Sequence, residues 1–366
     1  MANDKTVHYT MSPQTVPLKG RGASFNPPNR FQELHFESLE DEGPLEDDRE
    51  MSRIQTKFYV DDSRTAFAKN DSPDLGFAYS INPYRGCEHG CIYCYARPSH
   101  EYLGFSSGID FETKIMVKLG APKLLAEAFN AKTWKPQLVA LSGNTDCYQP
   151  IERKLELTRQ CLQIFLDFRN PVSIITKNAL VQRDVDILKD MAGLNTVSVT
   201  VSLTTLDNHL ARTMEPRTSS PVKRLETVEV LSKIGIRAGV LVAPVIPGLN
   251  DEEIPSLLRA AASSGAQYAG FTMLRLPYAI KELFQEWLKS NLPERASKIL
   301  SRIRDVRGGK LNDSTFGKRM RGEGHLAKSI QQLFRASHRK YFDESSKFTL
   351  SNEHFRRPRD LQLGIF

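Results

Sequence analysis

The sequence has few cysteines and no long hydrophobic stretch. It holds only five cysteines among 366 residues, and a count that is both small and odd argues against a disulfide framework. The longest apolar run, residues 239–249, is interrupted by Pro244 and Pro247 and falls short of the roughly 20 residues that cross a bilayer. The first residues also lack the basic-then-apolar pattern of a secretory signal. We therefore expect a cytoplasmic protein without a membrane partner.

Neither sign of charge is scarce in the whole chain, but the two ends differ. The net charge is +7. Residues 1–50 hold ten acidic and five basic side chains, whereas residues 301–366 hold fifteen basic and seven acidic ones. A basic C-terminal region is compatible with a nucleic-acid partner. It is also typical of an ordinary solvated surface, which charge alone favours.

The chain divides into three parts that differ in composition, charge and the periodicity of apolar residues. Residues 1–70 are predicted to form a polar, acidic and mostly disordered N-terminal extension, apart from a short strand at residues 57–60. Residues 71–290 are predicted to form an α/β core, because short β-rich runs alternate there with helical patterns. Residues 291–366 are predicted to form a basic, mainly helical C-terminal extension.

Six strands are predicted in the core. They cover residues 75–81, 138–142, 172–176, 197–203, 237–243 and 267–274, and the helices between them cover residues 152–168, 180–191, 222–234 and 251–263. Strands that alternate with helices indicate a parallel sheet. Six strands fit an open or partial barrel better than a closed barrel of eight.

Three of the five cysteines lie in one loop directly after the first predicted strand. The loop reads NPYRGCEHGCIYCYARP at residues 82–98 and contains Cys87, Cys91 and Cys94. Three thiolates can bind three irons of a cubane iron–sulfur cluster. The fourth iron then keeps an open position, which a catalytic site needs. Gly86 and Gly90 would let the backbone curve around such a cluster.

The residues of the loop also allow other interpretations. Zinc could be held by the same three cysteines together with His89 or His100. The cysteines could also be ordinary buried side chains. The crowded spacing favours the iron–sulfur interpretation, and the residues alone leave the alternatives open.

The segment CEHGCIYC resembles the CxxxCxxC signature of the radical S-adenosylmethionine (radical SAM) superfamily, with aromatic Tyr93 before the third cysteine. The segments SIITKNALVQRD, EPRTSSP and LVAPVIPGLND resemble the branch that includes spore photoproduct lyase and its uncharacterised bacterial relatives. The resemblance covers about residues 74–290. Residues 15–35 and 307–325 resemble only the uncharacterised relatives.

This resemblance implies a partial (β/α)6 TIM-like barrel with a [4Fe–4S] cluster on Cys87, Cys91 and Cys94. It also implies that S-adenosylmethionine binds the open iron and is cleaved reductively to a 5′-deoxyadenosyl radical, with the electron supplied by a donor of flavodoxin or ferredoxin type. The protein itself would orient the cofactor towards the substrate and exclude water from the site.

Cofactor-binding residues are expected at the carboxyl ends of the strands. The turn Ser142, Gly143 and Asn144 follows the second predicted strand and lacks the family's common Gly-Gly-Glu form. It would approach the amino group of the cofactor. The alternative is a plain polar turn.

Four further residues complete the expected cofactor site. By the same rule on strand ends, Lys177 would pair with the cofactor carboxylate, an arrangement that related lyases resemble, Ser202 would hydrogen-bond the ribose, and Val245 would form a wall against the adenine. Tyr93 would contact the cofactor beside the cluster. The ordinary alternatives are a surface lysine and a satisfied buried serine.

Cys147 follows the same turn, so we expect it to border the cofactor pocket. A thiol donates a hydrogen atom readily, and Cys147 is therefore a candidate catalytic residue. A small buried hydrophobic side chain is the more ordinary interpretation. Cys161 lies in an apolar helical stripe and is expected in the core.

Four charged residues lie just before the predicted helix at residues 222–234 or in its first turn: Arg212, Glu215, Arg217 and Arg224. They could meet a phosphate-bearing substrate. Salt-bridged residues near a helix start are the simpler interpretation.

Three functional hypotheses follow. The first is a radical SAM enzyme that acts on nucleic acid, and the second is one that acts on a protein or small molecule. The third is a non-catalytic zinc or iron–sulfur binding module. The polar residues expected at the strand ends favour the first two.

Overall fold

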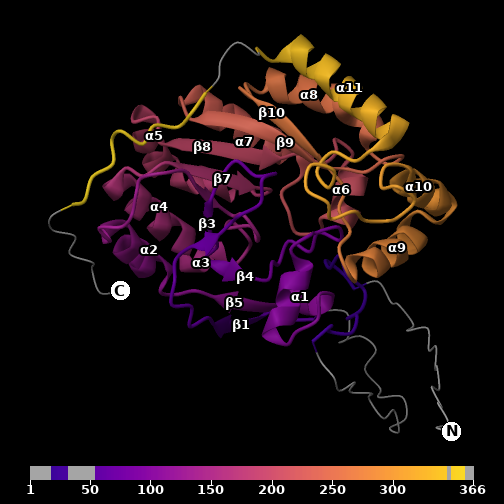
Figure 1. Cartoon of the computed structure of the whole chain (residues 1–366), viewed down its shortest axis with the longest axis horizontal. Helices are drawn as coiled ribbons and strands as arrows, with labels where there is room; N and C mark the ends of the chain where they lie inside the picture. The colour runs from indigo at the N-terminus through magenta and orange to yellow at the C-terminus, as the bar shows by residue number, and fades with distance from the viewer. Residues whose placement is uncertain (1–17, 32–53, 344–347, 359–366) are drawn as a thin grey trace, which may run out of the picture.

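A seven-stranded sheet forms the centre of the computed structural model, which describes residues 18–31, 54–343 and 348–358 (Figure 1). In spatial order the strands are β10 (Ala269–Met273), β9 (Arg237–Val245), β8 (Val197–Ser202), β7 (Val172–Thr176), β6 (Val139–Leu141), β3 (Tyr79–Ile81) and β2 (Ala68–Lys69). The first six are parallel, and β2 pairs antiparallel with β3 at the edge. The predicted parallel α/β sheet is confirmed.

Each predicted core strand coincides with one parallel strand of the sheet; β7 has the predicted ends, and the other five have shifted ends. β3 begins only at Tyr79 because residues 73–76 form a turn. β9 continues to Val245, two residues beyond the prediction. Every residue of β8 is buried, as expected for a central parallel strand covered on both faces.

Helices cover the sheet between successive strands (Figure 1). They are α2 (Ala121–Asn130), α3 (Glu152–Leu155), α4 (Leu157–Phe168), α5 (Val185–Gly193), α6 (Asn208–Met214), α7 (Pro221–Lys233) and α8 (Ile254–Ser263), with 3-10 turns η2 (Ala179–Asp184) and η3 (Asp251–Glu253). The predicted helix at 152–168 is divided, because Glu156 adopts a left-handed φ of 51° between α3 and α4. The main core lies between these helices and the sheet.

Helix α7 shows how local sequence sets an element's ends. The Ser220 side chain accepts a hydrogen bond from the backbone N–H of Lys223, and Pro221 occupies the first helical position. Gly235, at φ 84°, follows the last turn. This defined helix start places Arg224 one turn into α7.

A second, three-stranded sheet lies at the bottom of Figure 1. It consists of β1 (Lys57–Val60), β5 (Lys114–Val117) and β4 (Tyr84–Arg85), next to 3-10 helix η1 (Arg97–Leu103) and helix α1 (Ile109–Thr113). The predicted strand at residues 57–60 is thus confirmed. The remaining expectation for the N-terminal extension falls mainly on residues 1–17 and 32–53, which lie outside the described residues.

Residues 18–31, which we call the strap, contain no helix or strand but pack closely on the core. The backbone N–H groups of Gly22 and Ala23 donate to the Glu112 carboxylate at 3.0 and 2.8 Å. Arg97 pairs with the same buried carboxylate at 2.5 Å. The strap therefore lies against the segment that carries the cysteines.

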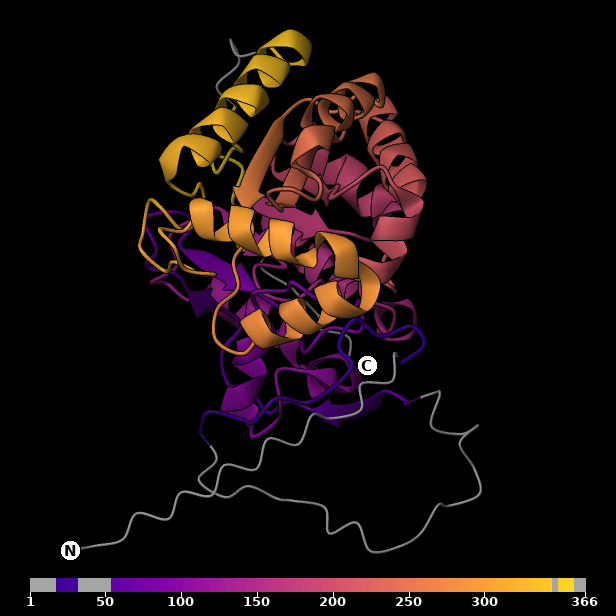
Figure 2. The ribbon, with the colours of Figure 1, turned by 90° about the vertical axis from the view of Figure 1, so that its right-hand side faces the viewer.

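The C-terminal part contributes α9 (Ile280–Asn291), α10 (Pro293–Asp305) and α11 (Gly324–Tyr341). Figure 2 shows α9 and α10 in orange across the middle of the view and α11 in yellow above them. The predicted helical character holds for α10 and α11, whereas residues 306–323 and 348–358 form neither helix nor strand. No helix within the described ranges is long and apolar enough to span a membrane.

Candidate functional site

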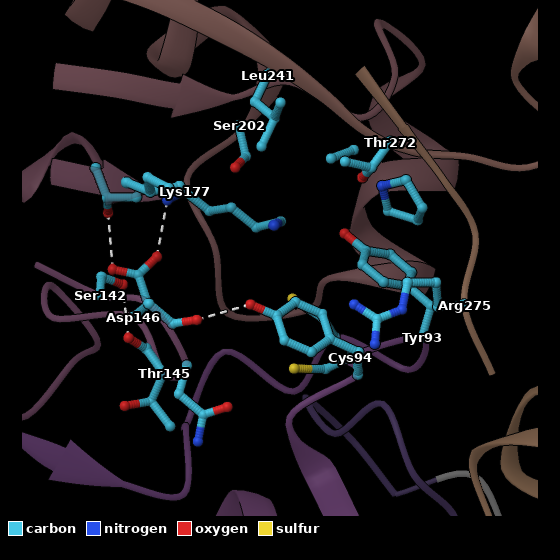
Figure 3. Close-up of a pocket in the computed structure, with 18 of the residues that line it drawn as sticks. Tyr93, Cys94, Ser142, Thr145, Asp146, Lys177, Ser202, Leu241, Thr272 and Arg275 are labelled. Carbon is cyan, nitrogen blue, oxygen red and sulfur yellow. Dashed lines mark hydrogen bonds between the residues drawn. The ribbon is translucent and has the colours of Figure 1, made fainter. Parts of the chain in front are cut away.

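A cavity of about 270 Å³ opens where the carboxyl ends of the parallel strands meet the cysteine loop. Side chains at the carboxyl ends of β6, β7, β8 and β9, or just after them, form one wall. The loop with Cys87, Cys91 and Cys94 forms another, and Figure 3 shows Cys94 on that side. Ligands bind at this end of the strands in parallel α/β folds. The topology thus brings residues from distant parts of the sequence to one place.

All three loop cysteines are free thiols and line the cavity. Gly86 and Gly90 have φ values of 78° and 67°, which let the loop turn on either side of Cys87. Burial, the charge of Asp146 and the neighbouring thiols raise the pKa of Cys87. Such thiols become thiolates when they bind metal cations, which supply the missing positive charge.

Neither histidine near the loop is placed to complete a zinc site, because His89 is engaged by protein partners and His100 lies outside the cavity. The Nδ1 atom of His89 lies 3.3 Å from the Asp146 carboxylate, and its Nε2 atom lies 3.2 Å from the side-chain nitrogen of Asn178. His100 is buried between the rings of Phe105 and Phe111 and does not line the cavity.

In the part of the chain that the structure describes, no three His, Cys, Asp or Glu side chains converge as one metal ion requires. A cubane cluster instead takes each thiolate on a separate iron. The three cavity-facing cysteines fit a [4Fe–4S] cluster on Cys87, Cys91 and Cys94, and they fit a single zinc ion poorly.

The turn after β6 is held by its own side chains. Ser142 has a left-handed φ of 78°, and its hydroxyl donates to the Thr145 carbonyl at 2.6 Å and accepts from the Cys147 N–H at 3.2 Å. Gly143 and Asn144 line the cavity beside it. A Cβ on Gly143 would lie 2.9 Å from the Cβ of Ser80, so a larger residue would displace the turn.

Asp146 links this turn to the end of β7. Its carboxylate accepts hydrogen bonds from the Thr176 hydroxyl and the Lys177 N–H, both at 2.8 Å. Burial works against ionisation, but His89 and backbone N–H donors hold the pKa of Asp146 at about 2. The carboxylate is therefore charged and committed to protein partners.

Lys177 and Ser202 reach the cavity from neighbouring strands. The Lys177 ammonium points into the space in Figure 3 and lies 5.8 Å from the Tyr93 ring centroid. No carboxylate of the described residues lies within ion-pair distance of it. Ser202 ends β8 and is buried at the cavity wall. The structure thus brings both predicted residues to the cavity.

Tyr93 connects the cysteine loop to a buried ion pair. Its hydroxyl donates to the Glu215 carboxylate, which also accepts from the Thr204 hydroxyl at 2.6 Å and pairs with Arg224. Burial raises the pKa of Glu215, while Arg224 opposes that rise. The position of Tyr93 therefore depends on this pair.

The segment EPRTSSP holds the cysteine loop from outside the cavity. The Arg217 N–H donates to the His89 carbonyl at 3.3 Å, and its guanidinium lies 3.5 Å from the Glu88 carboxylate. Arg217 and Arg224 thus have the salt-bridged, structural arrangement that we gave as the simpler interpretation. Arg212 makes no ion pair with any described residue.

Two residues predicted at the cavity, Val245 and Cys147, lie in the core instead, whereas Cys161 lies in the core as predicted. Val245 is fully buried in the core, and Ala243 and Pro244 line the cavity in its place. The pairing between β9 and β10 shifts register near this end, so the alternation of side chains cannot be extended to Val245.

Cys147 follows Asp146 directly, yet it does not line the cavity. Burial raises the pKa of its thiol, with the charge of Asp146 adding to the effect. Its location matches the small buried hydrophobic side chain that we gave as the alternative, and it offers no direct route for a hydrogen atom to a ligand in the cavity.

Tyr95, Arg275 and Met320 also line the cavity, and no role there was predicted for them from the sequence. Asp146 lines the cavity too. It ends the polar turn that begins at Ser142, which the strand-end rule selects, but no separate role was predicted for it. Met320 comes from the C-terminal segment, whose docking at the end of β10 has no periodic sequence signal. Its carbonyl accepts from the Met273 N–H at 2.9 Å.

Comparison with known sequences finds one matching family and several uncharacterised relatives. The radical SAM superfamily matches residues 81–261. An uncharacterised protein of Mycobacterium tuberculosis is 37% identical over 234 residues, which are 63% of this chain and 68% of that protein. An uncharacterised protein of Methanocaldococcus jannaschii is 31% identical over 219 residues, which are 60% of this chain and 78% of that protein.

Solved structures share the fold. Spore photoproduct lyase complexed with dinucleoside spore photoproduct superposes with a TM-score of 0.56 at 18% identity and covers 78% of this chain and 79% of its own. A mutant of that enzyme with bound AdoMet and dinucleoside spore photoproduct gives the same TM-score and coverage. At this identity the likeness shows the fold alone. The chain belongs to the radical SAM superfamily, whose enzymes use a [4Fe–4S] cluster and S-adenosylmethionine.

Proposed function

We propose that this chain cleaves S-adenosylmethionine reductively at a cluster on Cys87, Cys91 and Cys94, and that the substrate reacts in the same cavity. The observation that carries this proposal is the set of three free cysteines facing the strand-end residues across one cavity. A cluster held by these three cysteines would supply the one electron that splits S-adenosylmethionine into methionine and a 5′-deoxyadenosyl radical. Superfamily members generally need an external electron donor, and we propose one of flavodoxin or ferredoxin type.

The residues of the chain would bind and orient the cofactor. The Lys177 ammonium would pair with the cofactor carboxylate, because it is a compact charge without a carboxylate partner in the described residues. The Ser202 hydroxyl would bind the ribose. The Ser142–Asn144 turn would contact the amino group, and the Gly143 carbonyl already accepts from the Tyr95 hydroxyl at 2.8 Å. Ala243 and Pro244 would take the place of Val245 in the wall against the adenine.

The first test is anaerobic reconstitution of the wild type, Cys91→Ala and Cys161→Ala. We expect about four irons per wild-type chain, an EPR signal of the reduced form that changes with S-adenosylmethionine, and formation of 5′-deoxyadenosine. Cys91→Ala should lose all three, whereas Cys161→Ala should keep them because Cys161 lies in the core. Zinc in place of iron, or a cluster that does not respond to the cofactor, would overturn the proposal.

We further propose nucleic acid as the substrate class. Two observations support it: the fold shared with an enzyme solved with a dinucleoside photoproduct, and the basic residues that follow position 301. Binding of DNA or RNA should then weaken steeply with salt, and nucleic acid should stimulate 5′-deoxyadenosine formation. Absence of binding at low salt would remove nucleic acid and leave a protein or small-molecule substrate.

A further inference from the structure

Arg275 is a cation on the side of the cavity opposite Lys177. It follows β10, lines the cavity and is partly buried. Its guanidinium carbon lies 5.2 Å from the centroid of the Tyr95 ring, and one guanidinium nitrogen lies 4.0 Å from the sulfur of Met320. These contacts fix the orientation of the guanidinium without neutralising its charge.

No acidic side chain of the described residues forms an ion pair with Arg275. Asp74 acts on it electrostatically, but the Asp74 carboxylate is engaged by Arg319 at 2.6 Å and by the Gly317 N–H at 2.7 Å. Burial lowers the pKa of Arg275, although a guanidinium still stays charged at neutral pH. A partly desolvated cation without a direct ion-pair partner is costly, and an anion that reaches it lowers that cost.

The cavity as a whole is electropositive. Of its charged side chains, Lys177 and Arg275 have no carboxylate partner in the described residues, whereas the Asp146 carboxylate is committed to Thr176, Lys177 N–H and His89. Lys177 follows β7 and Arg275 follows β10. Because β8 and β9 lie between β7 and β10, the two strands are about 14 Å apart along the sheet at the usual strand spacing. Two separate anionic groups can therefore be held.

We propose that Arg275 binds an anionic group of the substrate, a phosphate or a carboxylate, on the β10 side of the cavity. This rests on the proposed function, in which Lys177 takes the cofactor carboxylate and leaves Arg275 to the substrate. The planar guanidinium can donate two parallel hydrogen bonds to either kind of oxyanion. Thr272 lines the same side and adds a hydroxyl donor.

The experiment uses anaerobically reconstituted protein saturated with S-adenosylmethionine. Inorganic phosphate and then acetate are titrated calorimetrically at constant chloride in a cationic buffer, with wild type, Arg275→Gln and Arg275→Lys. We expect one oxyanion to bind wild type, about ten-fold weaker binding to Arg275→Gln because a charge-assisted hydrogen bond is lost, and partial recovery in Arg275→Lys. Preference for phosphate or acetate distinguishes the two sources of the anion.

Arg259→Gln is the matched control, because Arg259 is an exposed arginine on α8 outside the cavity. It should bind both anions as wild type does. Equal anion binding by wild type and Arg275→Gln, or no binding of either anion, would overturn the inference. A ten-fold loss of S-adenosylmethionine affinity in Arg275→Gln would overturn it too, since the guanidinium would then serve the cofactor. If wild type forms no 5′-deoxyadenosine, the proposed function itself fails.

Discussion

His100 shows how a single buried side chain can control stability near the cysteine loop. It packs against Phe105 and Phe111, and the charges of Asp110 and Lys114 act on it from α1 and β5. Burial lowers its pKa from 6.5 to about 4. The unfolded chain therefore binds a proton at a higher pH than the folded chain, and acidification below about pH 6.5 favours unfolding.

We expect the free energy of unfolding of wild type to fall by about 2 kcal/mol more than that of His100→Gln between pH 7 and pH 5. Urea unfolding of reconstituted protein at the two pH values measures this difference. His209→Gln, which removes an exposed histidine from α6, should behave as wild type. An equal fall for wild type and His100→Gln would show that His100 does not titrate in this range.

Individual residues of the candidate site could be predicted from the sequence only where the spacing of a motif or the end of a strand marks them. The three cysteines are recognisable from their spacing, and Lys177 and Ser202 from the rule on strand ends. Arg275 was missed, because its significance depends on Asp74 being engaged by Arg319, a pairing across 245 positions. The cofactor roles of Lys177, Ser202 and the Ser142–Asn144 turn stay predictions.

Among the elements, the strap depends on two close backbone approaches. A Cβ on Gly22 would lie 1.7 Å from the Gly90 carbonyl oxygen, and a Cβ on Gly108 would lie 2.1 Å from the Phe25 carbonyl oxygen. Neither approach tolerates a methyl group. The strap therefore fits the cysteine loop only with glycine at position 22, and it fits the start of α1 only with glycine at position 108.

Gly22→Ala should destabilise the protein by about 3 kcal/mol, at the upper end for overpacking, and it should lower iron retention after reconstitution. Urea unfolding and iron analysis measure the two effects. Gly193→Ala is the control, because nothing lies within 4 Å of a Cβ at that helix position, and it should be neutral or slightly stabilising. Unchanged stability and iron content in Gly22→Ala would show that the strap does not support the loop.

Elements with a strong periodic signal were predicted well, and those without one were not. The division of residues 152–168 into α3 and α4 depends on the left-handed backbone of Glu156, which a non-glycine residue rarely adopts. The strap has no periodicity. Its structure comes from hydrogen bonds to Glu112, which lies about 90 residues further along the sequence.

At the scale of the whole molecule, α11 closes the core beyond the β10 edge of the sheet (Figure 1). The ring of Phe334 lies 4.6 Å from the ring of Phe271 in β10, and Phe334 is only 7% exposed. Leu333, the preceding residue of α11, is 37% exposed. The two neighbours thus differ in burial on the same helix.

Phe334→Ala should lower the free energy of unfolding by about 3 kcal/mol, because it leaves a cavity between α11 and the sheet. Leu333→Ala should cost clearly less, since its side chain is partly solvated already. Urea unfolding of the two variants tests this expectation. Equal losses would mean that the packing of α11 on β10 contributes little to stability.

The alternating pattern of strands and helices was enough to predict the parallel sheet. It could not predict how the ends of the chain attach to the core. The predicted boundaries near residues 71 and 291 remain predictions. Arg307 donates to the Lys318 carbonyl and to the Leu274 carbonyl, so a contact already crosses the second boundary.

The strap also bears on the order in which the protein assembles. Residues 22 and 23 leave the ribosome long before their hydrogen-bond acceptor at position 112, so the nascent strap has no docking surface. Contacts between such distant positions form late, because loop closure must precede them. We therefore expect the strap to dock last, after the cysteine loop and α1 have folded, and to cover the Gly90 carbonyl side of the loop only at that point.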